Sequence, residues 1–471
     1  MNRTTERHEG EGGVADQFKE QGGAATMDPS ALLRWATSKL MTRRNSARSN
    51  EKRRAKAERA RQKAGAPHRV EYFHQVEDGY SHLAAQLLLP LLEYYEVELI
   101  CHLVTVENDA NLPEPDLLLP LSRVDAAAVA PHYGLEFPEE REAPDPQCVA
   151  RAEQILAGVS QGDFPEAAVA VGKAVWADDV EGLSALAEKY GEKSRAEAQA
   201  AIAQGTARRA ELKHYSAAMF HYGGEWYWGA DRFYHLEERL TGYGACRKPS
   251  ERLLCPRPDV EYGPLKDDGT LTLEIYPSLR SPYTAIVFNE ALDLAERTGV
   301  RCVVRPVLPM VMRGVSATMQ KGQYIFFDTS REARARGLEF GPFYDPIGEP
   351  VRRAYSLYPW ACEQGKGEAL LSTFIEAAFF RGVNTNREAG MRLVVEKAGL
   401  SWEDAKDRIG NTDWEAWVEE NRQSMYEFGS WGVPSFRLLD AEGEEVVGLW
   451  GQDRLWYFSR EIQRLLARRS E

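Results

Sequence analysis

The sequence contains no two cysteines in a Cys-x-x-Cys arrangement. Its six cysteines, in a chain of 471 residues, also show no repeated spacing of the kind that zinc sites use. They are Cys101, Cys148, Cys246, Cys255, Cys302 and Cys362. A dithiol–disulfide exchange centre is therefore not expected. Free cysteines of this kind fit a reducing compartment, and we predict a cytoplasmic location.

Long apolar runs and a signal-peptide core are also absent. The longest apolar run, over residues 83–92, is about half of the roughly 20 residues that a membrane-spanning helix needs, and Pro90 interrupts it. The N-terminus carries acidic residues and has no hydrophobic core. We expect no membrane span and no export by that route.

Histidine is missing from the second half of the chain. All nine histidines lie within residues 1–235, and they lack the spacing of metal ligands. Scattered polar or buried histidines are the simpler interpretation, and no metal site is predicted.

The formal net charge of −14 is unevenly distributed. Residues 34–63 carry twelve Lys and Arg against two Asp and Glu, a local +10, so the remainder stands near −24. An acidic body should repel nucleic acid. The basic stretch could touch RNA or an acidic membrane surface, but we interpret residues 1–67 as a basic, largely disordered tail with one helix over residues 28–40.

What the sequence does contain is a proline, a hairpin and a helix near its C-terminus. The apolar runs 435–439 and 445–450 flank a turn-forming segment, which predicts a β-hairpin. Pro434 precedes the first run, and a proline cannot donate to a strand ladder. The Gly-Val-Pro entry is a place where a cis peptide would be tolerated. A helix is expected over residues 453–467.

The same order of elements occurs twice, which predicts a tandem duplication. Residues 70–73 align with residues 273–276 at an offset of 203, and residues 228–232 align with residues 450–454 at an offset of 222. Each half reads as strand, helix, strand, long helical region, hairpin and helix. The predicted divisions are the tail 1–67, a first domain 68–245, a linker 246–270 and a second domain 271–471.

Four motifs of the second half stand in a recognisable order. They are Ser281-Pro-Tyr283, Arg305-Pro-Val-Leu308, Gly432-Val-Pro-Ser-Phe436 and Trp450-Gly-Gln-Asp-Arg-Leu455. In this order and spacing the second half resembles the DsbA-like thioredoxin-fold superfamily, and within it the branch of 2-hydroxychromene-2-carboxylate isomerases and kappa-class glutathione transferases. The implied fold class is α/β, with two tandem thioredoxin-like (DsbA-type) domains that each carry an inserted helical subdomain.

The resemblance implies glutathione as the cofactor. Ser281, at a helix start where no cysteine is present, would donate its hydroxyl hydrogen to the glutathione sulfur and favour the thiolate. Val433, held by a cis Pro434, would offer its backbone to the cysteinyl part. Gln452 and Asp453 would take the γ-glutamyl end. For Ser281 and Asp453 a plain helix cap is the alternative, since the same side-chain oxygens serve both roles.

Arg305, which follows an apolar strand, is a candidate to steer an anionic substrate carboxylate. An exposed arginine at a strand end is the alternative. The first half departs from the motif at each chemical position, with Asp78, Gly79 and Ala218 where the second half has Ser281, Pro282 and Pro434. A carboxylate beside a thiolate would raise the thiol pKa, so the first copy is predicted to be inactive.

The predicted function is a glutathione-dependent isomerase or transferase that acts on a small electrophilic substrate, such as an aromatic or unsaturated keto acid. One alternative is a non-catalytic tandem binding module. Another is a DsbA-family oxidoreductase, which the missing Cys-x-x-Cys disfavours. Nucleic acid is expected to bind, if at all, only through the basic tail. The sequence makes no prediction of the oligomeric state.

Overall fold

The computed structural model describes most of the chain. The described residues are 28–105, 114–138, 142–315 and 318–470. The chain divides into two compact units, and the division between residues 261 and 262 falls inside the segment predicted as a linker. We call residues 47–261 with 318–321 the N-terminal unit, and residues 1–46, 262–317 and 322–471 the C-terminal unit.

The N-terminal unit is built on a four-stranded sheet of order β2-β1-β3-β4. β1 is parallel to β2 and antiparallel to β3, and β3 is antiparallel to β4. The strands are β1 (His68–His74), β2 (Val97–Leu103), β3 (Met219–Tyr222) and β4 (Glu225–Trp228). Apolar and aromatic side chains of β1 and β3 are fully buried, so the sheet forms the centre of this unit's core.

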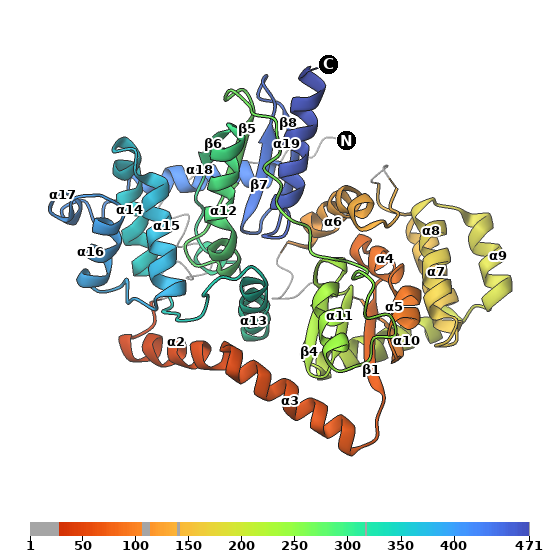
Figure 1. The fold of residues 1–471 in the computed structure, drawn as a ribbon. Helices are drawn as coiled ribbons and strands as arrows, with labels where there is room; N and C mark the ends of the chain where they lie inside the picture. The colour runs from red at the N-terminus through yellow and green to blue at the C-terminus, as the bar shows by residue number, and fades with distance from the viewer. Residues whose placement is uncertain (1–27, 106–113, 139–141, 316–317, 471) are drawn as a thin grey trace. The chain divides into compact units, whose positions relative to one another are not determined.

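Helices fill the rest of the N-terminal unit, mostly between β2 and β3. They are α3 (Ala47–Lys63), α4 (Gly79–Ala85), α5 (Leu88–Tyr94), α6 (Pro115–Val129), η2 (Ala130–Tyr133), α7 (Pro146–Gly158), α8 (Phe164–Trp176), α9 (Val180–Tyr190), α10 (Arg195–Glu211), η3 (Ala230–Arg232) and α11 (Phe233–Gly242). The long connection from β2 to β3 thus carries a helical insertion, as Figure 1 shows for α6 to α10.

The C-terminal unit has a sheet of the same topology, in the order β6-β5-β7-β8. β5 is parallel to β6 and antiparallel to β7, and β7 is antiparallel to β8. The strands are β5 (Thr272–Tyr276), β6 (Arg301–Val304), β7 (Ser435–Leu439) and β8 (Glu445–Trp450). A parallel pair followed by a hairpin is the strand order expected of a thioredoxin-like sheet, and the predicted hairpin is confirmed.

Most helices of the C-terminal unit lie in one long insertion between β6 and β7. The helices of this unit are α2 (Ala31–Asn45), α12 (Pro282–Thr298), η4 (Met310–Arg313), α13 (Met319–Ala335), α14 (Glu349–Glu363), α15 (Gly367–Ile375), η5 (Glu376–Phe380), α16 (Glu388–Lys397), α17 (Trp402–Lys406), α18 (Trp414–Glu427) and α19 (Leu455–Ser470). In Figure 1, α12 and α19 lie beside the sheet while α14, α15 and α16 gather away from it.

Three hydrogen bonds recur in the two units between residues 203 positions apart. The shared bonds fix the turn after the first strand and the helix that follows it. They are Val104 N to His74 O (2.8 Å) with Val307 N to Pro277 O (2.9 Å), Gln75 N to Ser81 Oγ (3.2 Å) with Ser278 N to Thr284 Oγ1 (3.3 Å), and Tyr80 Oη to Asp125 Oδ2 (2.7 Å) with Tyr283 Oη to Asp328 Oδ2 (2.8 Å).

The basic segment before β1 is helical: the helix predicted over residues 28–40 corresponds to α2, and the prediction of disorder is wrong for the residues of α3. α2 and α3 occupy residues 31–63, whereas residues 1–27 lie outside the described part of the chain. Composition suggested disorder because few apolar residues are present. α2 is instead fixed by polar contacts to distant residues, such as those of Arg34 with Asp345 O (2.7 Å) and Ile347 O (2.6 Å).

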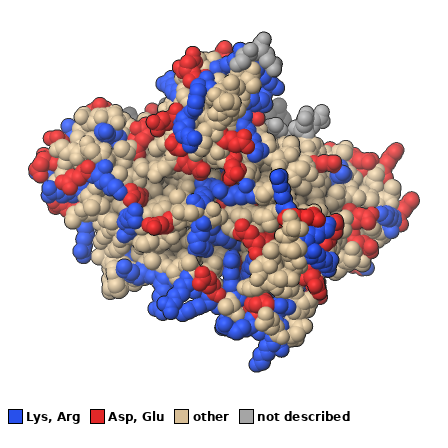
Figure 2. All heavy atoms as spheres, in the orientation of Figure 1, with Lys and Arg blue, Asp and Glu red and all other residues tan. Residues whose placement is uncertain are grey.

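Basic side chains cover much of this segment, along the lower edge of the view in Figure 2. In the ranges that the structure describes, no helix combines the length and the apolar character of a membrane span.

Candidate active site

Ser281 lies where the turn after β5 enters α12. Its Oγ accepts a hydrogen bond from Thr284 N (3.1 Å), so Ser281 is the N-cap of α12, with Pro282 in the first helical turn. The same Oγ donates to the carbonyl oxygen of Val433 (3.2 Å). The structure therefore brings Ser281 and Val433 together across 152 positions of sequence.

The peptide bond between Val433 and Pro434 is cis, as predicted. Pro434 directly precedes β7, and its carbonyl oxygen accepts from Gly451 N (3.0 Å) at the end of β8. Val433 O is taken by Ser281, while Val433 N makes no hydrogen bond to any residue that the structure describes. One backbone donor thus remains for a ligand beside the Ser281 hydroxyl.

Two tryptophans enclose the turn before Pro434. The rings of Trp431 and Trp450 are 5.2 Å apart, and a Cβ at Gly432 would lie only 2.3 Å from Nε1 of Trp450. A side chain at position 432 would therefore displace Trp450. Arg313, which is 3% exposed, donates from Nη2 to Trp431 O (3.0 Å) and adds a buried cation to this turn.

Gln452 is held by residues of the C-terminal unit. Arg336 Nη2 donates to Gln452 O (2.9 Å) and also to its side-chain oxygen, and Gln452 Nε2 donates to Glu332 Oε2 (3.2 Å). Both polar ends of the amide are therefore engaged at the end of α13. A γ-glutamyl contact from Gln452 would have to compete with these bonds.

Asp453 stands two residues before α19, which begins at Leu455 rather than at residue 453 as predicted. Its carboxylate is 14% exposed and lies 3.5 Å from Nη1 of Arg454. Gly451 has a φ of 126°, and a Cβ there would meet Asp453 Oδ1 at 2.4 Å. A glycine at position 451 is what allows the Asp453 side chain to fold back over this turn.

Arg305 forms an ion pair with Glu274, a residue of β5 that is 2% exposed. Arg305 Nε donates to Glu274 Oε1 (2.6 Å), and Arg437 Nε and Tyr276 Oη donate to Glu274 Oε2 (2.6 and 2.8 Å). Burial opposes the charge of Glu274, but these hydrogen bonds and the two arginines hold the pKa of its carboxyl below the usual value. The Arg305 side chain remains 33% exposed.

We expect Arg305→Met to lower the stability of the C-terminal unit by about 1–3 kcal/mol, because a buried carboxylate loses one charged partner. Thermal melts would show the loss. The exposed Arg301, at the start of β6, offers Arg301→Met as a matched control. An unchanged melting temperature together with weaker binding of an anionic substrate would instead support the predicted substrate role of Arg305.

The N-terminal unit has a carboxylate at the place of Ser281. Asp78 caps α4 by accepting from Ser81 N (2.9 Å) and Ser81 Oγ (2.7 Å). Burial raises the pKa of Asp78 to about 6 despite these bonds. Ala218, which precedes β3 as Pro434 precedes β7, has a φ of 54°. The N-terminal unit therefore has neither the hydroxyl of Ser281 nor the proline at position 434 in these places.

Two polar residues near Ser281 were missed by the sequence analysis. Arg280 directly precedes Ser281 and pairs with Asp345, its Nε to Oδ1 (2.9 Å) and its Nη2 to Oδ2 (3.0 Å). The position of Arg280 beside Ser281 was a signal that could have been used. The sequence around Asp345 contains no such signal, because its partner Arg280 is 65 positions away. In the described part of the chain, no three His, Cys, Asp or Glu residues are grouped so that they could hold a metal ion.

Comparison with known proteins identifies the fold of this region. A model of the DSBA-like thioredoxin domain matches residues 272–463. The comparison with curated proteins gives no match.

Solved structures of similar fold include a probable DsbA oxidoreductase from Streptomyces coelicolor (21% identity, 41% of this chain, 90% of that chain, TM-score 0.33). A 2-hydroxychromene-2-carboxylate isomerase is similar at 18% identity (42% of this chain, 98% of that chain, TM-score 0.35). The cytosolic disulfide reductase DsbM from Pseudomonas aeruginosa is similar at 19% (41% of this chain, 99% of that chain, TM-score 0.32). At these identities and TM-scores the likeness carries no argument for an activity.

Proposed function

We propose that the DsbA-like thioredoxin domain of residues 272–463 binds glutathione and uses it to isomerise or conjugate a small electrophilic substrate. The observation that carries the proposal is the contact between Ser281 Oγ and Val433 O (3.2 Å) beside Pro434, at a helix start that has no cysteine at position 281 or 284. A reactive sulfur at this place must come from a ligand.

The residues present fit glutathione. Val433 N has no partner among the described residues and would bind the cysteinyl carbonyl of the tripeptide, as a neighbouring strand does. Ser281 Oγ donates to Val433 O, and in the complex it would donate to the sulfur instead, which keeps the number of its donor bonds unchanged. α12 has 17 residues, and the positive end of its dipole lies at Ser281.

When bound, glutathione supplies a thiolate that forms a C–S bond at the β-carbon of an unsaturated ketone and later leaves with the electron pair, so that the C=C bond reforms after rotation. Ser281 would hold the sulfur in its ionised form by donating one hydrogen bond. Asp453 would face the γ-glutamyl ammonium, and Arg305 the substrate carboxylate. Conjugation would be the same reaction with a proton taken from solvent in place of the elimination.

We further propose that the two units arose by tandem duplication and that the N-terminal copy has lost the chemistry. Support comes from the identical strand orders and from the three hydrogen bonds that recur 203 positions apart. Asp78 replaces Ser281, which would donate to the thiolate, and Ala218 replaces Pro434, which holds Val433. The reducing cytoplasm that the free cysteines suggest would keep glutathione in its thiol form.

A non-catalytic binding module is the second candidate. It is favoured by the cap geometry itself, since both hydrogen bonds of Ser281 are already made within the protein.

The test is a rate measurement with the full-length protein, glutathione and an α,β-unsaturated ketone. We expect a saturable reaction of the enone at about a hundredfold or more above the rate in buffer, seen as loss of its absorbance if the substrate is conjugated and as formation of its geometric isomer by chromatography if it is isomerised. S-methylglutathione, which has no thiol, should give no reaction. A rate equal to that in buffer, with glutathione still bound, would favour the binding module.

A further inference from the structure

Arg280 presents an unused hydrogen-bonding edge next to Ser281. Its guanidinium pairs with Asp345 through Nε and Nη2, which is one edge of the planar group. Nη1 has no hydrogen-bond partner in the part of the chain that the structure describes, and the side chain is 34% exposed. The edge formed by Nη1 and Nη2 can therefore take a second carboxylate in bidentate fashion.

Asp345 is fixed on all its polar groups, so the direction of Arg280 is fixed as well. Asp345 N donates to Ser38 Oγ (3.0 Å), and Asp345 O accepts from Arg34 Nη1 (2.7 Å). Its Oδ1 also accepts from Ile347 N (3.1 Å). Burial opposes the charge, yet Arg280 and Arg34 hold the pKa of the Asp345 carboxyl below its usual value, which keeps the ion pair intact at neutral pH.

The helix that fixes Asp345 is α2, and hydrogen bonds from its side chains hold it against residues 343–347. Arg34, 1% exposed, also donates to Ile347 O (2.6 Å) and Asp28 Oδ1 (3.1 Å). Thr42 Oγ1 accepts from Phe343 N (3.1 Å). These bonds specify one register of α2 against residues 343–347, which an apolar contact would not do.

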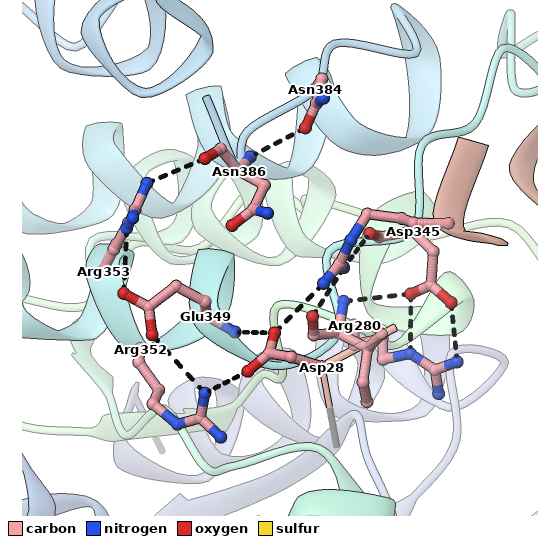
Figure 3. Close-up of polar contacts among 10 residues, drawn as sticks. Asp28, Arg280, Asp345, Glu349, Arg352, Arg353, Asn384 and Asn386 are labelled. Carbon is pink, nitrogen blue, oxygen red and sulfur yellow. Dashed lines mark hydrogen bonds and ion pairs between the residues drawn. The ribbon is translucent and has the colours of Figure 1, made fainter. Parts of the chain in front are cut away.

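Asp28, just before α2, makes further hydrogen bonds to the start of α14. Its Oδ1 accepts from Glu349 N (2.7 Å), and its Oδ2 accepts from Arg352 Nη1 (2.8 Å). Figure 3 shows Asp28 between Glu349 and Arg352, with the pair of Arg280 and Asp345 beside them. α2 lies outside residues 272–463, so a segment beyond the DsbA-like domain contacts Asp345, the partner of the residue that precedes Ser281.

We propose that Arg280 binds a carboxylate of the ligand at the Ser281 site, and that α2 positions Arg280 through Asp345. The inference rests on the proposed function and names the charge that the site recognises. Two sources share this chemistry, the glycine carboxylate of glutathione and the carboxylate of an acidic substrate. Arg280 and Ser281 are consecutive residues, about 3.8 Å apart between Cα atoms, and the proposal places the carboxylate and the thiol of the ligand on this one turn.

The first arm of the test is calorimetric titration of the full-length protein with glutathione and with its glycine ethyl ester. If the glycine carboxylate is the source, the ester should bind the wild type about ten- to a hundredfold more weakly. Arg280→Gln should weaken glutathione to the affinity of the ester and leave the ester unchanged. Arg280→Lys should restore part of the difference.

The second arm addresses the substrate. If the wild type binds glutathione and its ester equally, the ratio of KM between the methyl ester of an unsaturated keto acid and the free acid should be about ten to a hundred. Arg280→Gln should reduce that ratio to near one. If Arg280→Gln changes neither ratio, the carboxylate role is wrong even though the proposed function stands. If the wild type neither binds glutathione nor reacts, the proposed function fails first.

The role of α2 has its own variants. Asp345→Asn and Arg34→Gln should each reduce several-fold the ester-to-acid ratio that the wild type shows, of dissociation constants in the first arm or of KM in the second, because the guanidinium loses its orientation. Arg353→Gln is the matched control, since Arg353 bonds Glu349 (3.0 Å) and Asn386 O (2.8 Å) but neither Asp345 nor α2. It should lower the melting temperature and leave the ratio unchanged. An unchanged ratio in Asp345→Asn and Arg34→Gln would show that α2 has no part in recognition.

Discussion

A Ser281→Ala variant should raise the pKa of the thiol of bound glutathione by about one to two units and slow thiol addition about ten- to a hundredfold. The physical reason is the loss of one hydrogen bond to a charged sulfur, which contributes roughly 1.5–3 kcal/mol. Stability should change less, because a lost N-cap costs about 1 kcal/mol. Thiolate absorbance against pH measures the first effect, and thermal melts measure the second.

Ser401 provides the control for this variant. It caps α17 by accepting from Asp404 N (3.3 Å) and has no contact with the Ser281 turn. Ser401→Ala should cost a similar amount of stability and leave the thiol pKa unaltered. If Ser281→Ala behaves like Ser401→Ala, lowering only the melting temperature, then Ser281 is a cap and the binding module is the better account.

Acidification from pH 6.5 to 4 should unfold the N-terminal unit before the C-terminal one. Burial lowers the pKa of His74 to about 3 and those of His82 and His221 to about 4. In the unfolded chain these groups protonate near pH 6.5. Between these pH values the unfolded state binds more protons, so the stability is full above pH 6.5 and falls as the pH is lowered.

The expected loss is comparable to the whole stability of a domain. Each pKa unit corresponds to about 1.4 kcal/mol, so each of these three histidines should cost roughly 3 kcal/mol at pH 4. Asp78 acts in the opposite direction. Its pKa is raised to about 6, so its carboxyl favours the folded state as the pH falls through that value and offsets roughly one histidine.

Hydrogen exchange of the full-length protein, corrected for the intrinsic rate at each pH, would resolve the two units. We expect peptides of residues 47–261 to lose protection near pH 5 while peptides of residues 262–470, which contain no histidine, keep theirs. His82 has a buried Nδ1 with no partner in the described part of the chain, so His82→Leu should lower the midpoint. Equal acid sensitivity of both units would contradict the assignment to the histidines.

The strands could be predicted from the sequence because their signal is local. The two apolar runs on either side of a turn-forming segment located β7 and β8 at the bounds that the structure gives, and the pattern around Pro434 located the cis bond. The equality of the two sheet orders followed from the same pattern. Element bounds at helix starts were less accurate, since α19 begins at Leu455 and not at residue 453.

The partners of charged residues could not be predicted in the same way, because they are set by contacts between distant segments. Arg305 was predicted to steer a substrate carboxylate, with an exposed strand end as the alternative, and neither interpretation included its ion pair with the buried Glu274. A glutamate inside an apolar strand needs a cation, and that signal could have been used. The helical tail is fixed by Arg34 and Asp345, which are 311 positions apart and share no local pattern.

Binding of glutathione at Ser281 and Val433 can be tested by calorimetric titration of the full-length protein with glutathione. We expect one saturable site per chain, with binding weakened when Ser281 is replaced. We also expect a thiol pKa below that of the free tripeptide when the bound complex is titrated. The absence of saturable binding at millimolar glutathione would contradict the claim, and two equivalent sites per chain would contradict the division of roles between the two units.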